Sequence, residues 1–390
     1  MRTQVGIVGA GPAGLVLAHL LHLRGIDSVV LEARSREYVE RRIRAGVLEQ
    51  GTVDLLDEMG VADRLRREGL IHEGIELQFG GERHRIDFPS LADGRTITVY
   101  GQQEVVKDLI AARIETGRRL LFEVDSVTLA GLETESPTIG FVREGERHEL
   151  GCDFVAGCDG YHGVCRESIP SGVLAEFSRE YPFGWLGILA EAPPSNDELI
   201  YAYHDRGFAL HSMRSPALTR LYLQCRPDEN LDEWPDERIW AELERRFALE
   251  GWTLNRGEIV EKGVTGMRSF VVEPMQFGRL FLAGDAAHIV PPTGAKGLNL
   301  AVADVRVLAD ALVEWYVRGD DSLLERYSAE ALRRVWRAEH FSWWMTSMLH
   351  RLEGGDAFDA KLQLAQLAYV TSSPRAAASL AENYVGLERV

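Results

Sequence analysis

The sequence is poor in cysteine, in long apolar runs and in positive charge. The spacing of its four cysteines (Cys152, Cys158, Cys165 and Cys225) contains no CxxC pair, so it predicts no metal site. No apolar segment reaches about 18 residues, the length that a membrane-spanning helix needs. The 43 lysines and arginines face 60 aspartates and glutamates, and this net charge of −17 argues against nucleic acid or anionic membranes as partners.

What remains is the composition of a globular protein. The 390 residues are 45% hydrophobic and 26% charged, enough for two or three domains with sizeable cores. The N-terminus leads directly into an apolar run, without the basic and apolar segments of a signal peptide. We therefore expect a cytoplasmic protein whose thiols are reduced.

A glycine-rich turn follows the first apolar run. Residues 4–8 read as a strand that ends in Gly9-Ala10-Gly11-Pro12-Ala13-Gly14, and a helical pattern follows at once. A second strand, residues 28–31, ends at Glu32. In this motif the first glycine permits the tight turn, the second lets the backbone approach a pyrophosphate, and the third lets the helix pack on the strand. The acid suits a ribose, so the strand–turn–helix context predicts a dinucleotide site.

Two further corners combine glycine with a carboxylate. Gly284-Asp285 begins a loop with two prolines and two more glycines that reaches a helical pattern at Leu298 and Asn299. Rigid prolines and permissive glycines favour a backbone shaped around a ligand, and a helix start directs N–H groups at it. The other corner, Asp159-Gly160, follows a buried strand at residues 154–157. An ordinary strand–loop–helix connection is the plainer interpretation of each.

The order of these elements predicts an α/β fold of mixed α+β type. We expect a Rossmann-like dinucleotide-binding domain in two parts, residues 1–180 and 268–315. A β-sheet substrate domain, residues 181–267, would be inserted between them. Residues 316–390 would form a helical C-terminal region that contributes to a subunit interface.

Polar side chains share one face of the strand-rich middle segment. Ser212 and Arg214 are two residues apart, as are Arg220 and Tyr222 on the next strand, and Tyr201 lies on a neighbouring strand. Such a face is poor core material but suits an anionic, hydroxylated aromatic ligand. An exposed polar face is the alternative.

Other polar residues are less specific on pattern alone. Arg42 and Arg44 lie near the nucleotide corner, where two guanidinium groups could clamp a pyrophosphate. An exposed basic helix face would look the same. His72 is a lone histidine between two strands, a position that is more often structural than chemical.

Taken together, these motifs resemble the group A flavoprotein aromatic monooxygenases. The resemblance covers essentially the whole chain. It is carried by the three corners and by runs at residues 42–50, 181–187, 268–276, 284–299, 341–347 and 382–387.

This resemblance implies an enzyme that holds FAD and uses NADPH or NADH with O2. It would hydroxylate 4-hydroxybenzoate next to the phenol, through a flavin hydroperoxide, to give 3,4-dihydroxybenzoate. A homodimer is implied as well. A relative that acts on 3-hydroxybenzoate, salicylate or 4-aminobenzoate is the nearest alternative, and a FAD-binding protein without catalysis is a more distant one.

The resemblance also implies roles for individual residues. FAD would be held by the glycine-rich turn and by Glu32, Arg42, Arg44, Ala45, Gly46, Val47, Gln102, Asp159, Asp285, Leu298 and Asn299. The substrate would be bound by Tyr201, Ser212, Arg214, Arg220, Tyr222, Pro292 and Thr293. Tyr201, Tyr384 and His72 would relay the phenol proton to solvent, and Pro292 would shape the site. Contacts to the nicotinamide nucleotide would come from Arg34, Tyr38, His162 and Arg268.

The choice between the two nicotinamide cofactors is open at this level. Arg34 and Arg36 suit the 2′-phosphate of NADPH, whereas Glu37 and Glu40 oppose it.

Overall fold

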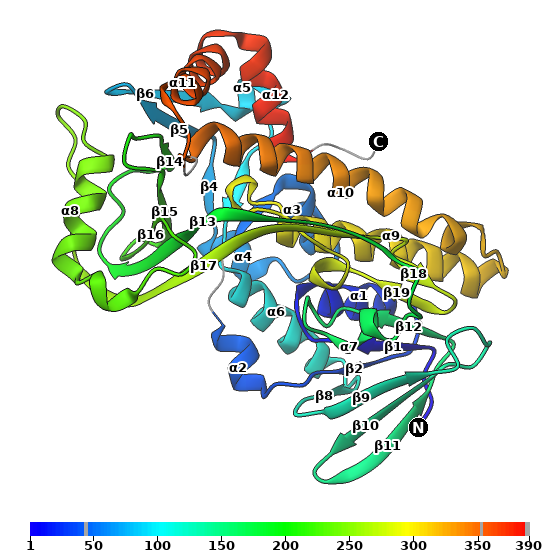
Figure 1. Ribbon diagram of the computed structural model, residues 1–390. Helices are drawn as coiled ribbons and strands as arrows, with labels where there is room; N and C mark the ends of the chain where they lie inside the picture. Colours follow the sequence, from blue (N-terminus) through cyan, green and yellow to red (C-terminus); the bar gives the residue numbers. More distant parts are fainter. Residues whose placement is uncertain (43–45, 352–353, 387–390) are drawn as a thin grey trace.

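A parallel sheet forms the nucleotide-binding half of the computed structural model, which describes residues 1–42, 46–351 and 354–386 (Figure 1). Four parallel strands lie at its centre in the order β19-β12-β1-β2. β8 extends the sheet in parallel at one edge, and β18 pairs antiparallel with β19 at the other. The strands are β1 (Val5–Val8), β2 (Ser28–Leu31), β8 (Leu120–Leu121), β12 (Phe154–Gly157), β18 (Gln276–Phe277) and β19 (Leu280–Leu282).

An eight-stranded sheet forms the second half, in the order β20-β17-β13-β16-β15-β14-β5-β6. Its longest strands, β13 and β17, pair antiparallel and run across the molecule from the lobe with α8 to the nucleotide-binding half (Figure 1). The strands are β5 (Gly74–Phe79), β6 (Glu82–Asp87), β13 (Ala175–Glu191), β14 (Leu199–Ala202), β15 (Ala209–Ser215), β16 (Leu218–Cys225), β17 (Glu258–Glu273) and β20 (His288–Ile289).

Two three-stranded sheets complete the β-structure. One is the antiparallel meander β9 (Asp125–Ala130), β10 (Thr138–Arg143) and β11 (Glu146–Gly151). The other joins β3 (Val47–Glu49), β7 (Ile97–Val99) and β4 (Leu70–His72).

Helices cover both halves. The long helices α9 and α10 pack on one another, and α1 contacts both α9 and α6. The α-helices are α1 (Pro12–Leu23), α2 (Arg36–Arg41), α3 (Gln50–Glu58), α4 (Asp63–Glu68), α5 (Phe88–Leu91), α6 (Gln102–Glu115), α7 (Val164–Glu167), α8 (Asp236–Arg246), α9 (Gly297–Arg318), α10 (Ser322–Leu349), α11 (Ala357–Ser372) and α12 (Pro374–Val385). Short 3₁₀ turns are η1 (Leu231–Glu233), η2 (Gly284–Ala286) and η3 (Pro292–Gly294).

The predicted fold class is confirmed, with two differences in detail. Within the predicted helical region 316–390, α11 and α12 are separate helices, because Pro374 opens α12 and the hydroxyl of Ser373 caps it. β5 and β6 belong to the eight-stranded sheet although they precede residue 180, and residue 180 itself lies inside β13. The division into four segments stays a prediction. Across the described residues, no helix has the length and apolarity to span a membrane.

Candidate active site

The three glycine-containing corners meet at the carboxyl edge of the parallel sheet. Gly9 has φ +105°, and a Cβ there would lie 2.2 Å from the carbonyl oxygen of Cys158, at the Asp159 corner. A Cβ on Gly14 would lie 2.0 Å from the Gly9 carbonyl, so α1 can approach β1 only without a side chain. A Cβ on Gly11 would meet nothing within 4 Å. The second glycine thus faces open space, as a pyrophosphate site requires.

Glu32 is tied to this first turn. Its two carboxylate oxygens accept hydrogen bonds of 2.8 Å from the backbone N–H groups of Ala10 and Arg34. The acid is therefore fixed at the end of β2, where a ribose would lie.

Asp159 has one carboxylate oxygen in use and one free of protein partners. Its Oδ2 accepts from the backbone N–H of Cys165 at 2.9 Å, which caps α7, while no described residue bonds Oδ1. Burial raises the pKa of this carboxyl. A buried acceptor without a partner, beside the open glycine turn, fits a hydroxyl-rich cofactor such as FAD.

The Gly284-Asp285 corner packs directly on α1. Gly284 has φ +62°, and a Cβ there would lie 3.6 Å from that of Ala13 and 3.1 Å from that of Ala301 on α9. Asp285 is half-buried within η2. The two corners that the sequence places 270 residues apart are therefore in contact.

Asn299 is expected to hold FAD, but its side chain already forms hydrogen bonds within the protein. Its Oδ1 accepts from the Glu49 backbone and from the Thr52 hydroxyl, and its Nδ2 donates to the carbonyls of Val47 and Ala295. All of these distances lie between 2.9 and 3.0 Å. Since the side chain is used within the protein, a flavin contact would come from the backbone N–H groups at the start of α9, beside half-buried Leu298.

The segment around Gly46 lies close to the end of β7, the strand that pairs with β3. A Cβ on Gly46 would lie 2.0 Å from the carbonyl oxygen of Tyr100, and its carbonyl accepts from the Tyr100 N–H at 2.9 Å. Val47 follows in β3, and Gln102 opens α6 nearby in the chain. Arg42 is exposed after α2, whereas Arg44 and Ala45 lie outside the described residues.

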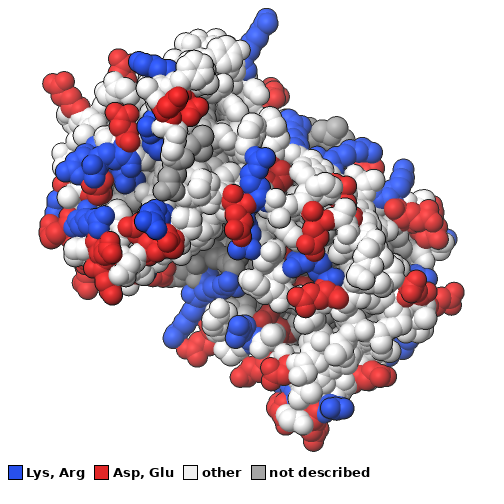
Figure 2. All heavy atoms as spheres, in the orientation of Figure 1, with Lys and Arg blue, Asp and Glu red and all other residues white. Residues whose placement is uncertain are grey.

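The residues predicted to contact the nicotinamide nucleotide form two pairs. The guanidinium carbon of Arg34 lies 5.3 Å from the ring centre of exposed Tyr38. His162 and Arg268 both contact Tyr161, at 4.9 Å between ring centres and at 4.8 Å from the guanidinium carbon. Figure 2 shows the surface hollowed between the lobe with α8 and the part with α2, with basic side chains at its lower edge. Such an edge suits an anionic nucleotide.

Most of the predicted substrate residues lie on one face of the eight-stranded sheet, with Arg214 at a bulge of β15 and Pro292 and Thr293 in η3. Cross-strand pairing joins Tyr201 to Leu210 and Leu210 to Tyr222, and the next same-face row joins Ser212 to Arg220. β15 and β16 form a hairpin that turns at Pro216 and Ala217. Arg220 also donates to Glu261 at 3.1 Å, and its guanidinium lies 5.4 Å from the Tyr222 ring centre.

Arg214 is a half-buried cation with neutral partners among the described residues. Its Nη1 donates to the Met213 carbonyl at 2.9 Å and to the Ser212 hydroxyl at 3.3 Å, and its Nε has no partner. Among the described residues no carboxylate pairs with it. Burial lowers the pKa of this guanidinium. A partly buried positive charge without a counter-ion is a site for an anionic ligand.

Tyr201 and Tyr384 join their hydroxyl oxygens at 2.5 Å, across 183 residues of chain. Both side chains are about 1% exposed, and burial raises the pKa of each phenol. Tyr384 stacks on Phe88 at 5.3 Å between ring centres, which fixes its orientation. The pair can pass a proton along a short hydrogen bond.

Lys296 anchors this pair, and so does Glu49, a residue that the sequence did not single out. The Lys296 ammonium donates to the Tyr384 carbonyl at 2.9 Å and to Glu49 Oε1 at 2.7 Å. Burial lowers the pKa of Lys296. The buried ion pair ties the loop after Gly284 to α12 and to β3.

His72 and the proline loop are less tightly connected. His72 is buried in β4, both ring nitrogens lack a partner among the described residues, and burial lowers its pKa to about 4. Pro292 is exposed, whereas Thr293 is fully buried and accepts from the Thr346 hydroxyl at 2.8 Å.

A group of aromatic side chains, here called the aromatic wall, packs behind the substrate face. The sequence did not reveal it. Trp185 packs 4.8 Å from Tyr222 between ring centres and donates to His350 Nε2 at 2.7 Å. His350 Nδ1 lies 3.0 Å from the Thr346 carbonyl, so α10 ties this wall to Thr293. The only signal in the sequence was the apolar cluster around residues 341–349.

Comparisons with known proteins agree with this geometry. A family model described as a FAD binding domain matches residues 2–342. The chain therefore belongs to this family of FAD-binding flavoprotein monooxygenases, and it is a FAD-dependent aromatic hydroxylase that uses NAD(P)H. The predicted family is confirmed.

Within this class the chain is similar to p-hydroxybenzoate hydroxylase of Acinetobacter baylyi, with 50% identity over 99% of this chain and 96% of the relative. It is 28% identical to a 3-(3-hydroxy-phenyl)propionate/3-hydroxycinnamic acid hydroxylase of Burkholderia cenocepacia, over 79% of this chain and 56% of the relative. The solved structure of p-nitrophenol 4-monooxygenase from Pseudomonas putida shares the fold, with a TM-score of 0.85, 20% identity and 99% of each chain covered.

Proposed function

We propose that this enzyme hydroxylates 4-hydroxybenzoate at C3 to give 3,4-dihydroxybenzoate, with FAD, NAD(P)H and O2. One observation carries the proposal: Arg214, which has no carboxylate partner among the described residues, and Tyr201 belong to neighbouring strands of one sheet. The Tyr201 hydroxyl meets that of Tyr384, which lies on α12. A ligand with a carboxylate at one end and a phenol at the other satisfies both. The 50% identity to a p-hydroxybenzoate hydroxylase supports it.

Arg214 would hold the substrate carboxylate. Its guanidinium can form two parallel hydrogen bonds to a carboxylate, with the hydroxyls of Ser212 and Tyr222 completing the contact. Arg220 would add positive charge on the same face. Pro292 and Thr293, which lie in the loop after Gly284, would cover one side of the substrate ring.

Tyr201 would accept a hydrogen bond from the substrate phenol and move its proton to Tyr384. The ionised phenol is the better nucleophile, and FAD, when bound, supplies the activated oxygen that it attacks. His72 would pass the proton on towards solvent; because burial lowers its pKa to about 4, the ring is neutral and would hold the proton only in transit.

FAD would be bound at the three glycine-containing corners. The turn from Gly9 to Gly14 and Glu32 would bind the pyrophosphate and ribose, and Asp159 and Asp285 the hydroxyls. The start of α9 would face the flavin ring. Further contacts would come from Arg42, Arg44, Ala45, Gly46, Val47 and Gln102. Arg34, Tyr38, His162 and Arg268 would contact NADPH or NADH.

Another ring acid is the second candidate. Salicylate, 3-hydroxybenzoate and 4-aminobenzoate also carry a carboxylate for Arg214. The tyrosine pair favours the 4-hydroxy acid, because carboxylate and phenol then lie at opposite ends of the ring.

The deciding experiment is stopped-flow reduction of the bound flavin by NADH and by NADPH across these four acids. We expect 4-hydroxybenzoate to accelerate reduction strongly and the other acids much less. Equal rates with and without 4-hydroxybenzoate would refute the substrate, and comparison of the two reductants gives the preferred cofactor.

The variant Tyr201→Phe tests the proton path. It should still bind substrate and be reduced, but release mostly H2O2, because removal of an acid–base group lowers a rate roughly 100-fold or more. The measurement is 3,4-dihydroxybenzoate formed per NAD(P)H consumed. A yield equal to that of the native enzyme would show that the pair has no such role.

A homodimer belongs to the same proposal. Phe177, Trp336 and Trp343 are each about 40% exposed and line a surface pocket of about 290 Å³ beside α10. Exposed aromatic side chains of this kind favour a protein interface. Light scattering would give the mass, and a monomer at micromolar concentration would refute this part. The cytoplasmic location stays a prediction.

A further inference from the structure

A single buried carboxylate ties both ends of the turn that carries Asp285. Asp304 Oδ2 accepts from the Gly284 N–H at 2.9 Å and from His288 Nε2 at 2.6 Å. Both side chains of the ion pair are about 2% exposed. The η2 turn lies between these two contacts.

The surroundings of His288 favour the charged imidazolium. Burial alone would lower the pKa of His288, but the adjacent Asp304 carboxylate raises it above its ordinary value, and Asp285 and Glu339 act in the same direction. A charged donor and a charged acceptor form the stronger kind of hydrogen bond, which holds the turn more firmly than neutral partners would.

Asp304 lies on α9, seven residues after Gly297, where that helix starts. Because α9 is one rigid element, a carboxylate fixed to it sets the distance between the Asp285 turn and the helix start. Those two places would face the ribityl chain and the ring of FAD. We infer that Asp304 and His288 are positioning residues that hold the two halves of the FAD site in register, an inference that rests on the FAD position proposed above.

The test is the FAD dissociation constant of Asp304→Asn, measured by flavin fluorescence on the reconstituted enzyme. Asparagine keeps an acceptor for Gly284 but loses the charge that pairs with His288. Loss of a hydrogen bond between charged groups costs roughly 10- to 100-fold in affinity, so we expect FAD to bind at least tenfold more weakly.

Tyr327→Phe is the matched control. The Tyr327 hydroxyl donates to the Leu282 carbonyl at 2.7 Å, on the strand just before the turn, and is equally buried. Its loss should lower stability comparably and leave FAD affinity within about threefold. If both variants lose stability and FAD affinity in the same proportion, Asp304 is merely structural and the inference is wrong.

Two further variants complete the test. The double variant His288→Gln with Asp304→Asn restores a neutral hydrogen bond and should bind FAD more tightly than Asp304→Asn alone, whereas additive losses would contradict a pair. Asp285→Ala separates the inference from the site on which it rests. Unchanged FAD affinity there would refute the FAD position, whereas a loss there with none in Asp304→Asn would refute only the inference.

Discussion

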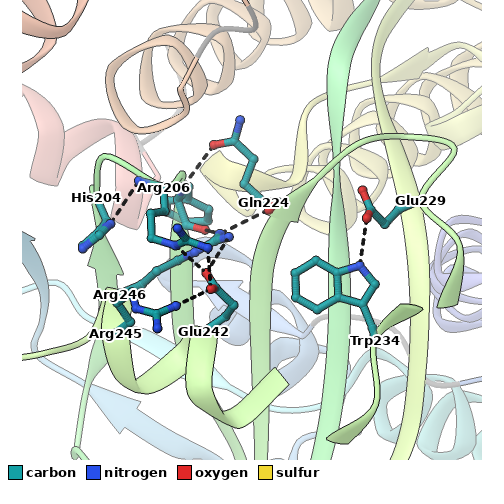
Figure 3. Close-up of polar contacts among 9 residues, drawn as sticks. His204, Arg206, Gln224, Glu229, Trp234, Glu242, Arg245 and Arg246 are labelled. Atoms are coloured by element: carbon teal, nitrogen blue, oxygen red, sulfur yellow. Dashed lines mark hydrogen bonds and ion pairs between the residues drawn. The ribbon is translucent and has the colours of Figure 1, made fainter. Parts of the chain in front are cut away.

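Two arginines, one in the eight-stranded sheet and one on the helix that covers it, differ in whether a carboxylate lies beside them. Arg246 on α8 is 5% exposed, donates to the carbonyls of Phe208 and Gln224, and lies 3.5 Å from the carboxylate of Glu242. Figure 3 shows that carboxylate shared with Arg206 and Arg245 as well. Arg214 lies in the same sheet, and its hydrogen-bond partners among the described residues are a hydroxyl and a carbonyl.

Burial lowers the pKa of both guanidinium groups, that of Arg246 to about 10. Burial acts against the charge of Glu242 too, yet the hydrogen bond from Arg206 and the nearby arginines keep its pKa below the ordinary value. Arg246 therefore has a carboxylate partner within the protein, whereas Arg214 has none among the described residues. We propose that this difference separates a structural arginine from one that binds a ligand.

The largest expected effect comes from Glu242→Gln, which removes the carboxylate charge beside Arg246. Buried Arg246 would lose its counter-ion, which costs about 3 to 5 kcal/mol of the free energy of unfolding. Urea denaturation of the holoenzyme measures it. The control is Glu244→Gln on the same helix, whose exposed pair with Arg256 contributes about 1 kcal/mol or less. If both variants are equally stable, the cluster in Figure 3 does not behave as a buried charge cluster.

The sequence predicted those parts of the site that depend on local geometry. The glycine turn, its strand and helix, and the alternation that places Tyr201, Ser212 and Tyr222 on one face follow from backbone sterics and from the two-residue period of a strand. These features need no knowledge of the rest of the chain.

Contacts between distant segments could not be predicted in the same way. Lys296 bonds Glu49 across 247 residues, and Trp185 bonds His350 across 165. Neither pair has a spacing that a pattern could reveal, because the packing of whole elements brings them together. The same holds for Asn299, whose side chain forms hydrogen bonds to β3 and α3 and is therefore not available to a ligand.

Arg214→Lys tests the arginine in the sheet and should have the smaller effect in free energy. Lysine keeps the charge but loses the planar fork, so binding of 4-hydroxybenzoate should weaken by about 2 kcal/mol, roughly 30-fold, with little change in stability or FAD affinity. Substrate titration of the flavin absorbance measures the first quantity, and flavin fluorescence the last.

Arg246→Lys makes the same substitution at the other arginine and tests the difference between Arg214 and Arg246. It removes the hydrogen bonds to Phe208 and Gln224 but keeps a charge near Glu242, so it should lower stability by about 1 to 2 kcal/mol and leave substrate binding unchanged. If Arg214→Lys instead weakens substrate and FAD binding equally, Arg214 is structural like Arg246. The missing counter-ion would then no longer distinguish a binding arginine from a structural one.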